Sequence, residues 1–166
     1  MHQEIFRRAM AQSAAMNPEP HSIHASAVLV GSYALLIRGP SGSGKSRLAL
    51  ALLQAADTGV LAFARLVADD RVLCRATHGR LLAQPAPRLE GLLEVRGLGI
   101  RRLPYESVAV VGAIVDLAAA DAARLPEPDS LAAVIDCVRL PRLAVAAGID
   151  PLPLVLASLA TDPLAG

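Results

Sequence analysis

The sequence predicts an α/β domain with a mixed sheet and one helix that follows a glycine-rich loop. Three observations predict it. The apolar segment 33–38 leads directly into a glycine- and serine-rich stretch, a leucine- and alanine-rich segment follows, and short apolar runs separated by turn residues continue toward residue 140. A strand–loop–helix–strand opening followed by more strands is typical of this fold class. With 54% hydrophobic residues, the chain has ample material for a packed core.

Residues 1–20 predict a tail or a short helix ending at Asn17-Pro18, and residues 21–166 predict a single domain. Gly31-Ser32 marks a turn between the first two strands, and Asp57-Thr58-Gly59 closes the helix after the glycine-rich loop. Pro151 favours the first turn of a terminal helix. The expected elements are strands over 23–30, 33–38, 62–68, 108–117 and 132–140, a hairpin from 71–75 and 80–83, and helices over 45–56 and 150–159.

Composition excludes several classes of function. The 16 basic residues against 15 acidic ones give a net charge of +1, and aromatic residues make up 2%, which argues against a nucleic-acid-binding protein. The longest apolar stretch, 25–37, is interrupted and shorter than the roughly 20 residues of a membrane-spanning helix. Cys74 and Cys137 predict free, buried thiols rather than a disulfide framework. We therefore expect a cytoplasmic protein.

The segment Gly39-Pro40-Ser41-Gly42-Ser43-Gly44-Lys45-Ser46 matches the phosphate-loop pattern G-x-x-x-x-G-K-[ST] at every fixed position. Glycines let backbone amides turn toward phosphate oxygens, and the helix that starts nearby favours an anion at its N-terminus. The pattern assigns Lys45 to the β- and γ-phosphates and the Ser46 hydroxyl to Mg²⁺. The motif therefore predicts binding of a polyphosphate group with Mg²⁺.

A second candidate motif is Asp69-Asp70, which follows the apolar segment 62–68. Ligands of open α/β sheets bind at the carboxyl ends of strands, so both carboxylates are expected beside the phosphate loop. One suits Mg²⁺, and the other suits acceptance of a proton from an attacking hydroxyl. A plain Asp pair in a turn is the competing interpretation.

Two further candidates are weaker by themselves. Glu94 and Arg96 share one face of the extended segment Glu94-Val95-Arg96-Gly97-Leu98-Gly99-Ile100, so Glu94 is a candidate metal ligand and Arg96 a candidate phosphoryl ligand. A surface salt bridge is the alternative. His24 lies in the first strand, either assisting a carboxylate or buried as a hydrogen-bonded core histidine. Arg101 and Arg102 fit a solvated face or a contact for an acidic partner.

Taken together, Ile23-His24-Ala25, the phosphate-loop motif, Leu66-Val67-Ala68-Asp69-Asp70 and Glu-Val-Arg-Gly-Leu-Gly-Ile at 94–100 resemble the catalytic domain of bacterial HPr kinase/phosphorylase. The resemblance covers residues 23–117. It implies a P-loop kinase fold of the phosphoenolpyruvate-carboxykinase-like type, in a short form without the separate N-terminal domain of longer relatives. It also implies the binding of ATP and Mg²⁺ and assembly into a homo-oligomer.

The resemblance implies that the partner is HPr, the small phosphocarrier protein of the sugar phosphotransferase system, phosphorylated on a serine. Many members also remove that group with inorganic phosphate, releasing pyrophosphate. Carried over by position, His24, Lys45 and Arg96 belong to the active site, and Ser46, Asp69 and Glu94 surround the metal. Asp70, supported by Asp69, becomes the base, although the residues alone leave open which aspartate does which job.

The chain departs from the family pattern at several positions. Arg47 and Ala51 stand where relatives usually carry acidic residues, and the segment from Arg139 onward lacks the Gly-Arg-Asn loop that longer members use in dephosphorylation. Kinase activity is therefore better supported than phosphorylase activity, and ATP or pyrophosphate remains open as donor. Two other functions stay under consideration: a kinase for a small-molecule hydroxyl, and a nucleotide-sensing module without turnover.

Overall fold

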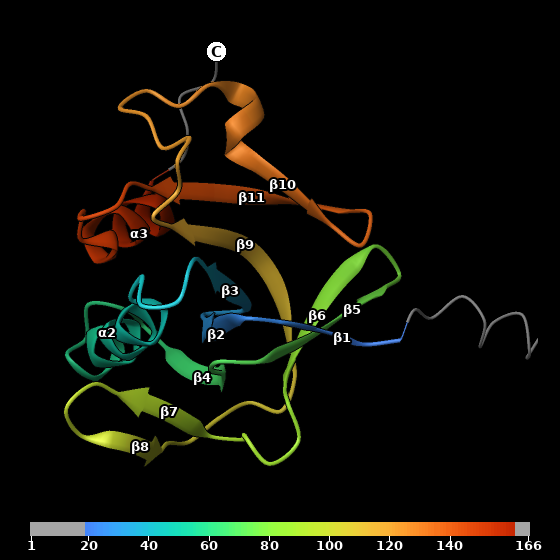
Figure 1. Ribbon diagram of the computed structural model, residues 1–166, viewed down its shortest axis with the longest axis vertical. Helices are drawn as coiled ribbons and strands as arrows, with labels where there is room; N and C mark the ends of the chain where they lie inside the picture. Colours follow the sequence, from blue (N-terminus) through green and yellow to red (C-terminus); the bar gives the residue numbers. More distant parts are fainter. Residues whose placement is uncertain (1–18, 162–166) are drawn as a thin grey trace, which may run out of the picture.

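The structure is a computed structural model that describes residues 19–161, and its centre is a curved nine-stranded sheet (Figure 1). The strand order is β1-β5-β6-β9-β3-β2-β4, and β11 also pairs with β9 and carries β10 on its outer side. The strands of this sheet are β1 (His21–Ile23), β2 (Ala25–Val30), β3 (Tyr33–Arg38), β4 (Ala64–Ala68), β5 (Val72–Thr77), β6 (Arg80–Pro85), β9 (Ala109–Leu117), β10 (Ala132–Ile135) and β11 (Val138–Val145).

Helices α2 (Lys45–Asp57) and α3 (Pro151–Ala160) cover one face of the sheet. Strand β3 is apolar on both of its faces, as expected for a strand that is covered on both sides. Leu35 and Ile37 belong to the core that includes α2 and α3, whereas Ala34 and Leu36 belong to the core inside the curve of the sheet. The continuous apolar run before the glycine-rich loop therefore reflects a central strand.

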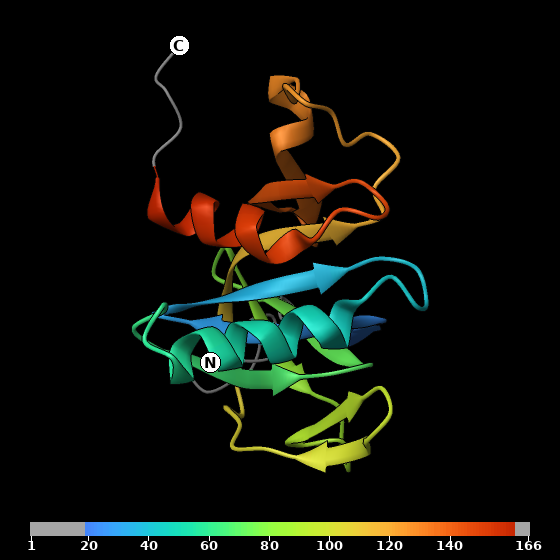
Figure 2. The ribbon, with the colours of Figure 1, turned by 90° about the vertical axis from the view of Figure 1, so that its left-hand side faces the viewer.

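The direction of the strands gathers their carboxyl ends at one edge. Strand β9 is parallel to β3, β11 is parallel to β9, and β4 runs in the direction of β3 because both are antiparallel to β2. The four strands end at the same side of the molecule, where the loop after β3 also lies (Figure 2). This edge is where α/β sheets bind ligands.

A separate two-stranded hairpin, β7 (Leu92–Val95) and β8 (Gly99–Arg102), flanks the free edge of β4. Leu93 is fully buried in the core of α2, and a backbone bridge joins Leu66 to Tyr105. The Glu106 amide donates to the Leu66 carbonyl at 2.8 Å. The hairpin is thus anchored at its base beside both α2 and β4.

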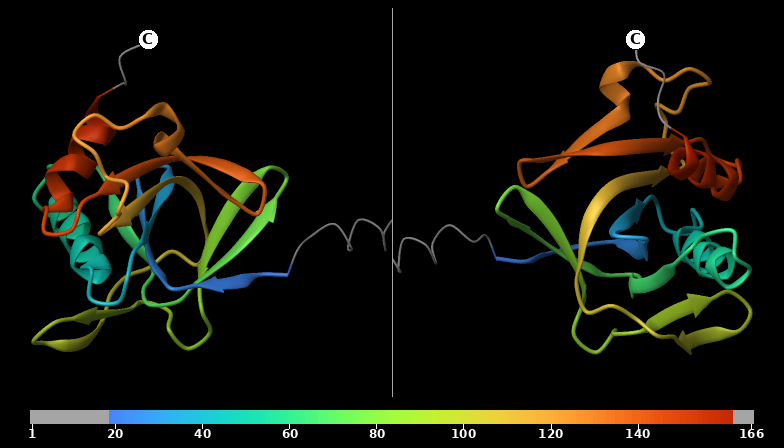
Figure 3. Two further views of the ribbon diagram at one scale, coloured as in Figure 1. Left: turned by 45° about the horizontal axis from the view of Figure 1, so that its top comes forward. Right: turned by 180° about the vertical axis from the view of Figure 1, so that it is seen from behind.

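The far half of the sheet bends away from the helices. Strand β9 curves, pairing first with β6 and then with β3 and β11, while β1, β5 and β6 extend to the other side (Figure 3). A short 3₁₀ turn, η1 (Pro128–Leu131), precedes β10. The expected N-terminal tail or helix falls on residues that, apart from 19 and 20, lie outside the described part of the chain.

Most of the expected elements are confirmed, with three corrections. Residues 132–140 are not one strand: Asp136 and Cys137 adopt positive φ and turn the chain between β10 and β11. The strand expected over 23–30 breaks at His24, so that β1 pairs with β5 while β2 pairs with β3 and β4. Both cysteines are free, but Cys137 is exposed at the hairpin turn rather than buried. In the described part of the chain, no helix has the length and hydropathy to cross a bilayer.

Candidate active site

The loop between β3 and α2 has the backbone shape that the phosphate-loop pattern requires. Gly39, Gly42 and Gly44 take positive φ values of 149°, 77° and 98°, which glycine adopts without strain. Helix α2 begins immediately afterwards at Lys45, with Gly44 as its N-cap. The Ser43 amide donates to the Pro40 carbonyl at 3.1 Å and tightens the turn. The N-terminus of a 13-residue helix therefore opens onto a glycine-rich loop.

Lys45 is buried and folded over this loop. Its Nζ donates to the Gly39 and Pro40 carbonyl oxygens, each at 2.9 Å. Burial lowers the pKa of the ammonium group, and the nearby carboxylates of Asp69 and Asp70 oppose that shift. The Lys45 amino group therefore lies against the loop that would receive phosphates.

Asp69 is buried and joins three segments of the chain. Ser46 Oγ donates to its two carboxylate oxygens, Oδ1 and Oδ2, at 2.9 Å each, and Ser26 Oγ donates to Oδ1 at 2.5 Å. The Glu94 amide donates to Oδ2 at 3.3 Å. These contacts fix the positions of both carboxylate oxygens of Asp69.

Asp70 is the opposite of its neighbour: its side chain is 65% exposed. Its φ of 65° and the hydrogen bond from the Arg71 amide to the Asp69 carbonyl at 2.7 Å make a tight three-residue turn, which projects Asp70 off the end of β4. His24 Nδ1 lies 3.1 Å from the Asp70 carbonyl oxygen and 3.3 Å from its Oδ1. His24 is also exposed, so the buried-core interpretation of this histidine is wrong.

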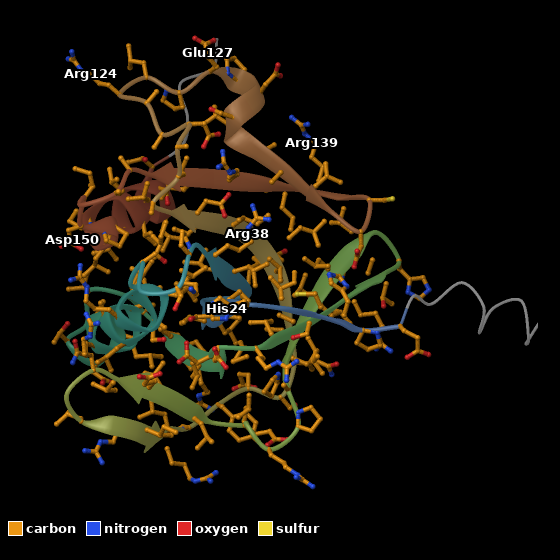
Figure 4. All side chains as sticks on the ribbon, in the orientation of Figure 1. His24, Arg38, Arg124, Glu127, Arg139 and Asp150 are labelled. Carbon is orange, nitrogen blue, oxygen red and sulfur yellow. The ribbon has the colours of Figure 1, made fainter. Side chains whose placement is uncertain are left out.

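A single cleft of about 330 Å³ brings together all the expected catalytic and metal-binding residues, whereas Gly39, Pro40 and Ser43 of the glycine-rich loop do not line it. Glu94, at the end of β7, and Arg96, just beyond it, line this cleft with the aspartates, and no Glu94–Arg96 salt bridge forms among the described residues. The cleft is lined by His24, Ser41, Gly42, Gly44, Lys45, Ser46, Arg47, Leu50, Asp69, Asp70, Glu94, Val95 and Arg96. Figure 4 shows His24 at the bend between β1 and β2.

The donor set suits Mg²⁺ together with a polyphosphate. Ser46 and Asp69 already touch, and Glu94 lines the same cleft. Within residues 19–161 no three His, Cys, Asp or Glu side chains form a ready-made metal cluster. Mg²⁺ characteristically takes one or two carboxylates and completes its shell with water and substrate phosphates. The residues present therefore fit a metal that arrives with its nucleotide.

Sequence reasoning missed several residues that the fold places in or near the site. Ser26 contacts Asp69, and its position as a hydroxyl inside the apolar strand β2 was the available signal, because buried hydroxyls require partners. Arg38 and Asp116, at the ends of β3 and β9, form a two-pronged ion pair with both N–O distances at 2.7 Å. The loop 146–149 lies beside the glycine-rich loop, and no local pattern in the sequence signals that proximity.

Fold and cleft together define an α/β domain that presents a glycine-rich loop, a buried lysine and two adjacent carboxylates at the carboxyl edge of its sheet. The family model of the HPr serine kinase C-terminal domain matches residues 16–104. This match covers more than half of the chain, so the chain belongs to that family.

The similar proteins agree with this assignment. HPr kinase/phosphorylase from an Exiguobacterium species is 47% identical over 76 residues, which is 44% of this chain and 22% of that protein. The protein of the same name from Streptococcus thermophilus is 43% identical over 83 residues, or 49% of this chain and 25% of the relative. The aligned region thus spans about a quarter of the length of these relatives.

A solved structure shares the fold over most of the chain. The HPr(Ser) kinase/phosphatase from Coxiella burnetii superposes with a TM-score of 0.67 at 20% sequence identity. The superposition covers 84% of this chain and 88% of that one. The mixed α/β architecture, including the part beyond the family-model match, is therefore shared with a member of this group.

Proposed function

We propose that this chain is the catalytic domain, over residues 21–166, of a Mg²⁺-dependent phosphotransferase that moves the γ-phosphoryl group of ATP to a serine of an HPr-type phosphocarrier protein. The observation that carries the proposal is the pairing of a buried aspartate with an exposed one beside the phosphate-loop motif. The fold type within this proposal is the phosphoenolpyruvate-carboxykinase-like P-loop kinase.

The two aspartates have different roles in the proposed reaction. Asp69, fixed by Ser46, Ser26 and the Glu94 amide, is placed to help hold Mg²⁺, with Glu94 nearby. The bound metal would neutralise charge on the β- and γ-phosphates. Asp70, which faces solvent, is placed to meet an incoming hydroxyl. Positioning and electrostatic stabilisation supply most of the catalysis in phosphoryl transfer, so this division covers the main requirements.

In the forward direction the serine oxygen forms a bond to the γ-phosphorus, and its proton passes to the Asp70 carboxylate. The bond between the γ-phosphorus and the bridging oxygen breaks, and its electron pair leaves with ADP. Lys45 and Arg96 line the cleft and stabilise the phosphoryl oxygens. His24, beside Asp70, orients that carboxylate. In phosphorolysis, an oxygen of inorganic phosphate forms a bond to the phosphorus of phosphoserine, and the bond from that phosphorus to the serine oxygen breaks. Asp70 gives a proton to the departing serine oxygen, and pyrophosphate is released.

The hairpin beside the cleft favours a protein substrate over a small molecule. Leu98 and Ile100 are 62% and 67% exposed on β8 and its turn, next to Arg96. Exposed apolar side chains at the rim of a cleft are typical of surfaces that contact other proteins.

The test is transfer of labelled phosphate from ATP to purified HPr from the same source, with and without Mg²⁺, followed by addition of phosphate. A panel of small hydroxyl compounds replaces HPr in a parallel arm. We expect Mg²⁺-dependent labelling of HPr. No labelling of HPr under any condition, or labelling of a small molecule instead, would refute the proposed substrate.

Asp70→Asn tests the assignment of the base. Asparagine tolerates positive φ, so the turn is retained. We expect single-turnover transfer to fall by about 100-fold or more while ATP affinity stays within a few-fold of wild type. Asp57→Asn, at the far end of α2, is the matched control and should behave as wild type. Weaker ATP binding with unchanged single-turnover chemistry would contradict the assignment.

A further inference from the structure

The β7–β8 hairpin has two faces of different character. Directly opposed residues of an antiparallel pair share a face, and neighbours along a strand alternate between faces. Arg101 lies opposite Leu93, which is fully buried in the core that includes α2, so Arg101 belongs to the face turned toward α2 although its own side chain is exposed. The other face, called the outer face below, consists of two opposed pairs, Glu94 with Ile100 and Leu92 with Arg102.

The outer face continues the catalytic cleft beyond its rim. Glu94 lines the cleft, whereas Ile100 and Arg102 do not. Ile100 stands directly opposite Glu94 and is 67% exposed. The Leu98 amide donates to the Val95 carbonyl at 2.9 Å, which closes the turn and fixes the two strands beside each other. A molecule confined to the cleft touches neither Ile100 nor Arg102, so contact with this face requires a ligand that extends past the rim, as a protein does.

The hairpin carries an excess of positive charge. Residues 92–102 contain three arginines and a single acidic residue, Glu94. Within residues 19–161, none of the ion pairs involves Arg96, Arg101 or Arg102. The Arg102 side chain donates from Nη1 to the Glu90 backbone carbonyl, and at 3.5 Å this is a long hydrogen bond. The guanidinium of Arg102 therefore retains the capacity to pair with a carboxylate of a partner.

We propose that the outer face of the hairpin is the docking surface for the protein substrate, and that this substrate presents an apolar side chain and a carboxylate beside the serine that is phosphorylated. This inference rests on the phosphotransfer function proposed above. While the serine enters the cleft, the apolar side chain packs on Ile100, and the carboxylate pairs with Arg102. Arg101, on the opposite face, takes no part in this contact.

Transfer of labelled phosphate at saturating ATP and Mg²⁺, with the concentration of HPr varied, tests the proposal. We expect Arg102→Glu to raise the KM for HPr by about tenfold or more, because it places like charges at the contact, and to leave kcat within about twofold. Arg101→Glu is the matched control, with the same charge change one residue away, and should alter the KM by less than about twofold. Raising the ionic strength from about 0.05 to 0.5 M should raise the wild-type KM more than that of Arg102→Ala, since salt screens the charge pair.

The apolar part of the contact is tested at Ile100. We expect Ile100→Ser to raise the KM for HPr by about fivefold and Ile100→Val to restore it. Val60→Ser removes a similarly exposed apolar side chain beyond the far end of α2 and should leave the KM unchanged. Benzoylphenylalanine in place of Ile100 should crosslink to HPr on illumination, whereas the same group in place of Val60 should not.

Three outcomes would overturn the docking surface while leaving HPr as the substrate. They are KM values that none of the outer-face variants changes, equal KM changes for Arg101→Glu and Arg102→Glu, and a fall in kcat at unchanged KM. Absence of HPr labelling by the wild-type chain would refute the proposed function together with this inference, so the two failures are distinguishable.

Discussion

Asp69 and Asp70 show how one peptide bond separates two chemical environments. The first side chain is 5% exposed and saturated with donors, whereas the second faces solvent beside His24. A carboxylate held by two hydroxyls and an amide keeps its position, which suits a metal ligand. A carboxylate at the surface is free to accept a proton from a substrate. The turn at Asp70 is what separates them.

Lys45 is the single lysine of the chain, among 15 arginines. Its compact ammonium reaches two carbonyl oxygens of the loop within a buried space. The planar, five-donor guanidinium of arginine needs more room and different geometry. We expect Lys45→Arg to lower the phosphotransfer rate by about 100-fold or more.

The measurement is kcat for transfer to HPr, together with a thermal melt. A melting temperature close to wild type shows that the loss arises in the site rather than in the fold. Full activity of Lys45→Arg would show that phosphotransfer does not require an ammonium group at this position.

At the scale of single residues, the sequence predicts the site residues that belong to recognisable motifs and few others. Lys45, Ser46 and the two aspartates meet because the phosphate-loop pattern and the apolar strand before Asp69 fix their places locally. The exposure of His24 could not be predicted, since it depends on a break between β1 and β2 that separates two strand partners. The hydroxyl of Ser26 inside an apolar strand signals a polar partner, but only the structure identifies that partner as Asp69.

Among the elements, the loop after β3 has its tightest point at Gly39. A Cβ there would lie 2.6 Å from Ser43 Oγ and 2.8 Å from the Leu117 carbonyl oxygen. Because backbone from β9 is one of the two obstacles, the clash cannot be relieved by a side-chain rotation alone. We expect Gly39→Ala to destabilise the fold by about 1–3 kcal/mol and to abolish ATP binding.

Gly31→Ala is the matched control. Gly31 also has positive φ, at 61°, but a Cβ there meets nothing within 4 Å. This variant should cost about 1 kcal/mol of unfolding free energy and retain ATP affinity. Chemical denaturation and calorimetry check both. Equal effects from the two substitutions would contradict the steric account of Gly39.

The two cysteine thiols differ in exposure, and this difference predicts different reactivity. Cys137 is exposed at the turn, whereas Cys74 is buried in β5. Burial, with a further contribution from Asp136, raises the pKa of the Cys74 thiol to about 12. We expect iodoacetamide at pH 8 to modify one thiol in the native protein and two in denaturant, because thiolates are the reactive form.

Mass spectrometry of the alkylated protein measures this. Cys137→Ser should abolish native labelling, whereas Cys74→Ser should leave it intact. Rapid native modification of both thiols would mean that β5 opens readily.

Elements with local signals were predictable, and turns without them were not. The helix from Lys45 and the strand over 33–38 follow from a glycine-rich loop and an apolar run. The turn at Asp136-Cys137 has an aspartate but lacks the glycine that usually follows it in tight hairpins, so the apolar pattern predicts one continuous strand over 132–140. The approach of loop 146–149 to the glycine-rich loop results from tertiary pairing and has no sequence pattern of its own.

Across the whole molecule, an ion network ties the central strands together on the sheet face opposite α2. Asp116 on β9 accepts hydrogen bonds from Arg38 on β3 and from Arg142 on β11, and Arg142 also pairs with Asp121. Arg38 lies beside β9 in Figure 4. Burial alone would raise the pKa of Asp116, but the hydrogen bonds and charges of the two arginines outweigh it and lower that pKa.

This network predicts acid sensitivity. Because the folded-state pKa of Asp116 lies below the unfolded value of about 4, ionised Asp116 stabilises the fold above that pH. The contribution is lost as the pH falls through the folded-state pKa. We expect Asp116→Asn to lose about 1–3 kcal/mol of unfolding free energy at pH 7 and to show a weaker loss of stability below pH ~4.

Urea denaturation at several pH values between 3 and 7 measures this difference. Asp57→Asn removes an exposed carboxylate from the end of α2 and serves as the control. A pH profile of Asp116→Asn that parallels wild type throughout the acid range would exclude the network as the source of acid sensitivity.

The pairing of β3 with β9 has a consequence for how the chain reaches its native state. Arg38 and Asp116 are 78 positions apart, and β4 to β8 are made between them. At roughly 5–20 residues per second, a ribosome takes several seconds to supply β9 after β3. Pairings between such distant segments also slow refolding of the complete chain. Strand β3, which precedes the phosphate-loop motif, therefore cannot pair with β9 until that later segment has been synthesised. A nascent chain terminated early would contain the motif without the β9 backbone that packs against Gly39.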